Sequence, residues 1–196
     1  MVSLPSLHTN YNSGYTKSQE KYQYYPSIKN KLIYHEKIIS VIFMLYGEKL
    51  KYLREEKELH QKDLAELIEV HPATYSQFER EDVIMPIKRL NTYSNFFNVS
   101  LDYLFSFTNN KQYKNVKKEI NPTLSGTRLK EFRKEHKITQ VNLAKFLNTT
   151  QSNIVGYEKG NFIIATPYLF MICKKYSISA DYLLGKIETP KYLNES

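Results

Sequence analysis

The stretch TTQSNIVGYEKG, from Thr149 to Gly160, opens with five uncharged polar residues and then becomes mixed. Ile154, Val155 and Tyr157 supply its large apolar side chains, and it ends on Glu-Lys-Gly. A helix with this pattern carries hydrogen-bonding groups in its first turn and buries side chains only from its second. A distorted copy, VHPATYSQFERE, lies 79 residues upstream and begins at Val70.

These two stretches belong to a longer internal repeat. Residues 47–107 align with residues 126–186 at a constant offset of 79 and without a gap. GEKLKYLREEKELHQKDLAELIEV in the first copy pairs with GTRLKEFRKEHKITQVNLAKFLNT in the second, and VSLDYLF pairs with ISADYLL. Such self-similarity at a fixed offset indicates duplication of one structural unit.

Helical periodicity runs through each copy. In the second copy, Leu129 and Phe132 recur at a three-residue step, and Leu143, Phe146 and Leu147 at three- and four-residue steps. Each set forms one apolar stripe on a helix. Neither copy shows the alternation that is typical of a half-buried strand.

Boundary residues divide each copy into five short helices. Thr139 and Thr150 are suited to cap helices that begin at Gln140 and Gln151. Asn148 falls in the tight turn between these helices, where asparagine tolerates a left-handed backbone. The remaining signals are Pro167 at the first position of a fourth helix, Ser179 before a short fifth helix, and Pro86 and Ser100 at the corresponding boundaries of the first copy.

The repeat therefore predicts an all-α protein with two tandem five-helix domains, at residues 47–108 and 126–186. A basic linker, residues 109–125, joins them, and a tail, residues 187–196, follows. Within the N-terminal extension, residues 1–46, we expect residues 1–30 to be disordered. Residues 31–46 form an apolar lead-in, either helix or strand. Met44 precedes LYGEKLK, so residues 1–43 are either an upstream-start extension or a functional arm.

Composition narrows the class of protein further. The chain has 196 residues and a formal charge of +8, which suits an acidic partner such as nucleic acid. A single cysteine excludes a disulfide framework and suits a reducing cytoplasm. Five scattered histidines give no metal-ligand spacing, so we expect neither a metal nor another cofactor. The apolar run IISVIFMLY is too short to span a bilayer, and we expect no membrane association.

Each copy resembles the Cro/phage-repressor type of helix-turn-helix domain, the xenobiotic-response-element class of bacterial regulators. The matching features are an opening G-x-x-L-K, an arginine before the second helix and a glutamine at that helix's start. A Leu-Ala pair, an aromatic-Glu pair ending the third helix, and a closing Ser-x-Asp-Tyr-Leu complete the set. The resemblance covers about 120 of the 196 residues. It implies the lambda-repressor-like DNA-binding fold, with double-stranded DNA as partner.

The resemblance also implies which residues meet DNA. Helix three of such a domain lies in the major groove with its N-terminal residues against base edges. The implied base-reading positions are Gln151, Ser152 and Gly156 in the second copy, and Pro72, Ala73 and Gln77 in the first. Positions that face phosphate or the groove edge are Asn153, Lys159, Thr139 and Gln140, with Gln61 and Arg80 as DNA contacts in the first copy. Glutamine suits a bidentate bond with adenine.

Two further pairs are structural in the family. They are Arg54 with Glu79 and Arg133 with Glu158, and each joins the first helix to the end of the third. We therefore expect these four residues to form internal salt bridges rather than DNA contacts.

The two copies are not equal. Residues 47–108 carry 8 basic and 11 acidic side chains, net −3, whereas residues 126–186 carry 10 and 4, net +6. Residues 109–125 add +3. In the first copy Glu81 replaces the glycine after the third helix, Glu69 occupies the inter-helix turn, and His60 replaces a capping threonine. We expect the second copy to dominate DNA binding and the first to be a weaker reader or a scaffold for protein contacts.

These observations favour a bacterial or phage transcriptional regulator, which we expect to be a repressor. A first alternative is a protein-interaction module such as an antitoxin, in which the first copy and residues 31–46 bind a protein partner or a second chain. A second alternative, a DNA-processing enzyme, ranks last because too few residues remain outside the copies to form a catalytic domain. The sequence carries no catalytic constellation, so we do not expect an enzyme.

Overall fold

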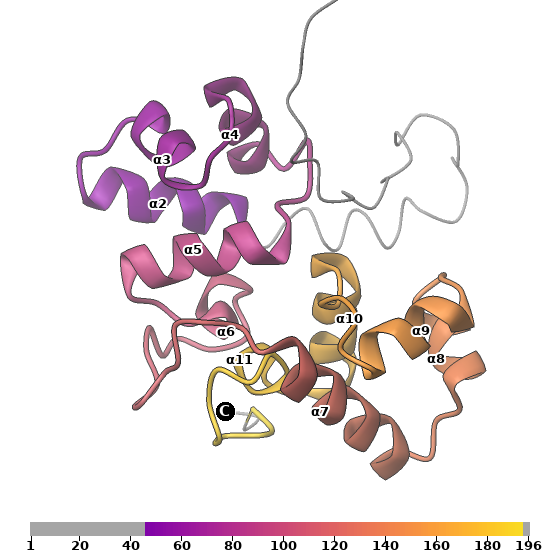
Figure 1. Ribbon diagram of the computed structural model, residues 1–196. Helices are drawn as coiled ribbons and strands as arrows, with labels where there is room; N and C mark the ends of the chain where they lie inside the picture. The colour runs from indigo at the N-terminus through magenta and orange to yellow at the C-terminus, as the bar shows by residue number, and fades with distance from the viewer. Residues whose placement is uncertain (1–45, 194–196) are drawn as a thin grey trace, which may run out of the picture. The chain divides into compact units, whose positions relative to one another are not determined.

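A computed structural model describes residues 46–193, and within that range the regular elements are all helices, with no strand (Figure 1). The first copy contains α2 (Gly47–Glu56), α3 (Gln61–Leu67), α4 (Pro72–Glu79), α5 (Ile87–Phe97) and α6 (Leu101–Leu104). The second contains α7 (Pro122–Glu135), α8 (Gln140–Phe146), α9 (Gln151–Glu158), α10 (Thr166–Tyr176) and α11 (Ala180–Leu183). The all-α fold and its two five-helix copies are confirmed. The expected disordered segment, the lead-in before Tyr46 and the last three residues lie outside the described residues.

Side-chain caps start the helices where the sequence predicts them. Thr139 Oγ1 accepts the backbone N–H of Asn142 at 3.1 Å, and Thr150 Oγ1 accepts that of Asn153 at 3.2 Å. Each bond satisfies one of the donors that a helix start leaves without an intrahelical partner. Ser100 and Ser179 cap α6 and α11 in the same way.

The turns between helices place residues in the left-handed region. Asn148 has φ 51° between α8 and α9, as predicted, and its counterpart Glu69 has φ 55°. After the third helix, Gly160 has φ 70° and its counterpart Glu81 has φ 61°. Glu81 gains a compensating contact, because its Oε1 accepts the N–H of Gly47 at 2.8 Å and so caps α2. The acidic replacement in the first copy is therefore part of its fold.

Glycine at the start of the repeat lets two helices approach closely. A Cβ added at Gly126 would lie 2.4 Å from the carbonyl oxygen of Tyr157 at the end of α9. One added at Gly47 would lie 2.6 Å from the carbonyl oxygen of Glu79 at the end of α4. In each copy the first helix therefore packs backbone to backbone against the end of the third, which only glycine permits.

Two boundaries differ from the sequence expectation. Pro167 is the second residue of α10, which begins at Thr166, because Ala165 supplies the extended N-cap position. Helix α7 begins at Pro122, within the segment expected to be linker, because Asn121 Oδ1 accepts the N–H of Leu124 at 2.9 Å. The first helix of the second copy is therefore 14 residues long, compared with 10 in the first copy.

The two copies share one core. Buried apolar side chains of both repeats belong to a single contiguous cluster, which includes Leu50, Phe105, Phe132 and Phe170. Residues 46–193 fall within one compact unit of the structure. None of the described helices has the length and apolarity to cross a membrane.

The short helices α6 and α11 cap each other across the repeats. Asp181 Oδ2 accepts the backbone N–H of Asp102 at 2.9 Å, and Asp102 Oδ1 accepts that of Ala180 at 2.7 Å. Ser179 Oγ and Tyr113 Oη also donate to Asp102. Because Asp102 and Asp181 are equivalent in the repeat, the contact is close to two-fold symmetric. Both carboxyl groups are fully buried.

Burial, reinforced by the charge of Asp181, raises the pKa of Asp102 to about 7. Burial also raises the pKa of Asp181, against the attraction of Lys186. The folded state therefore holds a proton on this pair that the unfolded chain would release. Stability from that proton is present below the ordinary carboxyl pKa and is lost as pH rises toward and through about 7.

We expect the melting temperature to fall between pH 5.5 and pH 8 and the fall to be smaller in Asp102→Asn. An asparagine oxygen still accepts the Ala180 N–H but does not titrate. Thermal unfolding of both proteins across this range measures the difference. The same slope in both proteins would show that the Asp102–Asp181 pair does not titrate there.

Candidate nucleic-acid interface

A buried glutamate ends the third helix of each copy and ties three elements together. Glu158, on α9, receives a two-pronged bond from Arg133 on α7, through Nε to Oε1 and through Nη2 to Oε2 at 3.0 Å. Gln140, the first residue of α8, donates its Nε2 to the same Oε2 at 2.9 Å. Arg133 Nη1 also donates to the Ile138 carbonyl at 2.9 Å. Only 3% of the Glu158 side chain is exposed.

The first copy repeats this arrangement atom for atom. Arg54 donates Nε to Glu79 Oε1 at 2.6 Å and Nη2 to Oε2 at 3.1 Å, while Gln61 Nε2 donates to Oε2 at 2.8 Å. Burial disfavours the charged form of Glu79, but the bonds from Arg54 and Gln61 outweigh it and hold the pKa of that carboxyl below its ordinary value. Both internal ion pairs that the resemblance implied are therefore present.

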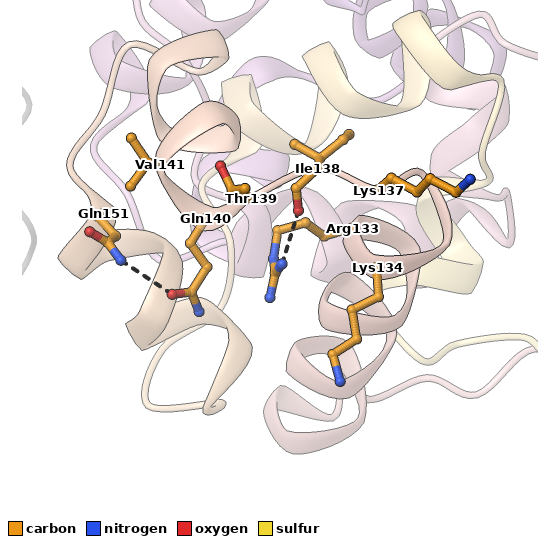
Figure 2. Close-up of a pocket in the computed structure, with 8 residues that line it drawn as sticks. All are labelled: Arg133, Lys134, Lys137, Ile138, Thr139, Gln140, Val141 and Gln151. Carbon is orange, nitrogen blue, oxygen red and sulfur yellow. Dashed lines mark hydrogen bonds between the residues drawn. The ribbon is translucent and has the colours of Figure 1, made fainter.

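In the second copy the network continues to the expected DNA-facing surface. Gln151 Nε2 donates to Gln140 Oε1 at 3.4 Å, and Figure 2 shows the two amides facing each other from α9 and α8. Because Gln140 gives its NH₂ group to Glu158, its oxygen is turned toward Gln151. The side chain at the tip of α9 is thus oriented through Gln140 by a buried carboxylate. In the first copy Pro72 stands in place of Gln151 and cannot join such a chain.

A hollow of about 570 Å³ lies beside these glutamines. Its lining comes from the end of α7, the following turn, the start of α8 and the start of α9 (Figure 2). The lining residues are Arg133, Lys134, Lys137, Ile138, Thr139, Gln140, Val141 and Gln151. The hollow therefore combines cationic groups with neutral hydrogen-bonding groups.

The charge of this surface is reversed between the copies. Lys134 and Lys137 are exposed in the second copy, and their counterparts at the same positions of the first are Glu55 and Glu58. The net charges of the copies follow from their composition, and the structure shows that part of the difference lies beside the turn between α7 and α8. The two lysines were not among the expected site residues, and a comparison of the repeats position by position would have found them.

The remaining expected residues differ in how open they are. Asn153 is half-buried, and its Nδ2 donates to Thr149 Oγ1 at 2.8 Å, so its amide braces the turn before α9. Arg80 is exposed but pairs with Asp82 and donates to Ser76. The exposed residues are Gln151, Ser152, Lys159, Thr139, Pro72, Ala73 and Arg80, and the half-buried ones are Gln140, Asn153, Gln61 and Gln77.

Gly156, one of the expected base-reading positions, lies beneath an aromatic side chain. It is buried, and a Cβ added there would lie 2.3 Å from the ring of Phe162. That ring also meets Tyr157 edge to face, with centroids 4.9 Å apart. Gly156 therefore makes room for an aromatic side chain and presents no group of its own. Phe162, still 38% exposed, is a further side chain at this surface that was not among the expected site residues.

Comparison with known proteins assigns the fold to a family. The helix-turn-helix family matches the chain twice, over residues 50–104 and 129–183, which together make up more than half of it. The two matches fall on the two structural repeats. The chain therefore belongs to the helix-turn-helix family.

Similar proteins include the HTH-type transcriptional regulator ImmR of Bacillus subtilis (strain 168), 39% identical over 66 residues, which are 34% of this chain and 52% of ImmR. The uncharacterized HTH-type transcriptional regulator YobD of the same strain is 33% identical over 63 residues, 32% of this chain and 56% of YobD. The antitoxin PezA of Streptococcus pneumoniae serotype 4 (strain ATCC BAA-334 / TIGR4) is 28% identical over 61 residues, 31% of this chain and 39% of PezA. The chain thus spans about half the length of these relatives or less. No solved structure shows significant similarity to it.

Arg133→Ala should destabilise the protein by about 3–5 kcal/mol, because it leaves the Glu158 carboxylate buried without its charged partner. Denaturant unfolding measures the loss. Lys130→Ala, an exposed change on the same helix, is the matched control and should cost little. Normal stability combined with lost DNA binding would instead identify Arg133 as a phosphate contact.

Proposed function

We propose that the chain is a sequence-specific regulator of transcription that binds double-stranded DNA, with α9 as its main recognition helix. The observation that carries the proposal is the exposed Gln151, held by Gln140 at the first turn of α9. Polar residues at the N-terminal turn of a recognition helix read base edges in the major groove. The rest of α9 packs against the domain, because Ile154, Tyr157 and Glu158 are buried.

Gln151 has the chemistry for one base in particular. An amide side chain that donates to N7 and accepts from N6 pairs bidentately with adenine. Gln140 uses one of the two N–H groups of Gln151, which leaves the other N–H and the oxygen for the base. Ser152, exposed next to it, offers a hydroxyl to either kind of base edge. We therefore expect an adenine in the better-defined half of the operator, at the position that Gln151 contacts.

Phosphate contacts follow from the cations of the same surface. Lys134 and Lys137 at the hollow and Lys159 after α9 are exposed in the second copy. Cations that neutralise phosphates supply most of the sequence-independent affinity of such proteins. Thr139, at the exposed start of α8, adds a neutral contact at the groove edge.

The first copy is the weaker reader in this proposal. Pro72 and Ala73 offer no side-chain hydrogen bond, Gln77 is half-buried, and Arg80 is already paired with Asp82. Glu55 and Glu58 would repel phosphate where the second copy carries lysines. We expect an operator that is well defined at one end and loosely defined at the other.

We expect a repressor that acts by occupying its operator, without catalysis or a cofactor, in the cytoplasm where the DNA lies. The second candidate function is that of an antitoxin, because the chain is also similar to the antitoxin PezA. The acidic first copy, net −3, favours a protein contact there. Steep loss of DNA affinity with added salt supports the regulator, whereas a stable complex with a protein partner that masks the first copy supports the antitoxin.

Gln151→Ala should weaken binding to the selected operator by about 1–3 kcal/mol and leave binding to random duplex DNA nearly unchanged. The operator is first selected from random duplexes, and both affinities are then measured at one salt concentration. An equal loss on both DNAs would make Gln151 a backbone contact.

Lys134→Glu/Lys137→Glu should reduce affinity for all duplexes and lower the slope of log affinity against log salt by about 2, because two phosphate contacts are lost. Lys174→Glu/Lys175→Glu on α10 is the matched control, since both lysines are exposed and the change in net charge is the same. The proposed phosphate contacts would be refuted by equal losses in the two variants.

A further inference from the structure

The contact between the two repeats resembles the interface of a symmetric dimer formed within one chain. Its centre is symmetric: Asp102 and Asp181 occupy equivalent positions, and each caps the short helix of the other repeat. In a two-fold interface, residue i of one unit meets residue j of the other, and residue j of the first meets residue i of the second. The flanking contacts can therefore be compared in equivalent pairs.

One flank of the interface is polar. Lys186, just after α11, is 0% exposed and donates Nζ to Asn91 Oδ1 at 2.6 Å and to Ser94 Oγ at 3.3 Å, both on α5. Asn95 Oδ1 accepts from the same ammonium at 3.3 Å. The ammonium also lies 3.9 Å from Asp181 Oδ1. A buried cation is stable only where such acceptors surround it.

The equivalent flank is aromatic. At the offset of 79 residues, Lys186 corresponds to Phe107 and Asn91 corresponds to Phe170 on α10. The rings of Phe107 and Phe170 pack against each other with centroids 5.0 Å apart, and Phe105 meets Phe170 edge to face at 5.5 Å. The same two positions thus hold a cation with its acceptors on one side and two stacked rings on the other.

We propose that these two flanks form a matched key that pairs each repeat with the other repeat of the chain and rejects a second copy of itself. Two second repeats would place Lys186 against Phe170 twice, with Cys173 and Lys174 where Ser94 and Asn95 supply oxygens. Two first repeats would place Phe107 against Asn91 twice. Either like pairing buries a polar group without its partner, which costs far more than the matched contact contributes.

The segment between the repeats favours pairing within one chain. Lys117 N–H donates to the Lys186 carbonyl at 2.8 Å, and the Lys118 carbonyl accepts from Asn91 at 2.9 Å and from Asn95 at 2.8 Å. The connecting segment therefore docks beside the polar flank and contacts both repeats. The partner surface of each repeat is occupied by the other repeat, and the chain is a monomer.

The residues of the polar flank and the aromatic flank can be exchanged between the repeats without changing the amino-acid composition of the chain. In the half-exchange, Phe107→Lys/Lys186→Phe, each flank within the chain is mismatched, while first-with-first and second-with-second pairings between chains become matched. The full exchange adds Asn91→Phe/Phe170→Asn, Ser94→Cys/Cys173→Ser and Asn95→Lys/Lys174→Asn, so that every acceptor of the ammonium moves with it. It restores a matched pairing within the chain, with the two flanks reversed. Both variants are made in the full chain.

Thermal unfolding and sedimentation of the wild type and both variants, each over a hundredfold range of concentration, test the key. The wild type and the full exchange should sediment as monomers, and the full exchange should recover most of any loss in melting temperature. The half-exchange should melt lower and gain mass as concentration rises. A half-exchange that matches the wild type, a full exchange without recovery, or a dimeric wild type would overturn the proposal. Neither measurement depends on DNA, so the proposed function stands or fails separately.

Discussion

A buried carboxylate at the end of the third helix is the constraint on which each repeat depends. Glu158 receives hydrogen bonds from Arg133 on α7 and Gln140 on α8 while it sits on α9, so one side chain fixes three elements. An ion taken out of water is stable only if its partners are held in place, and these bonds therefore demand one relative position of the helices. The glycine that opens each repeat makes this arrangement of the helices possible. Because it has no Cβ, the first helix can approach the carbonyl oxygens at the end of the third helix.

The network also links the buried core to the proposed recognition surface. Gln140 is oriented by Glu158, and Gln151 is oriented by Gln140, so the first side chain of α9 is positioned from the core outward. Preorganisation of this kind lowers the entropy lost when a side chain orders itself against a base. The first copy keeps the buried part of the network and lacks its outer end, because Pro72 replaces the outer glutamine. Duplication has thus preserved the buried network in both copies and the proposed reading surface in one.

Between the repeats, buried polar groups specify which surfaces meet. Asp102, Asp181 and Lys186 are all fully buried, and burial of charge contributes little net stability even when every group is paired. Asp102 and Asp181 are equivalent and could cap a like repeat equally well, whereas Lys186 would face Phe170 in place of Asn91 if two second repeats met. A chain that carries two similar domains needs such discrimination, because each repeat would otherwise find an equally good partner in its neighbour on another chain.

The sequence alone determined the local structure at many positions of this protein. The caps at Thr139 and Thr150, the left-handed turn at Asn148 and the apolar stripes depend on neighbours a few residues away, so they could be predicted from the sequence. The duplication and its resemblance to a known family extended that reasoning to the ion pairs. Only the tertiary structure decided that Gly156 lies beneath Phe162 and that Lys186 ends among oxygens of α5. These contacts depend on which helices pack together. The apolar pattern along a helix predicts that one face is buried, but it does not predict which element packs against that face.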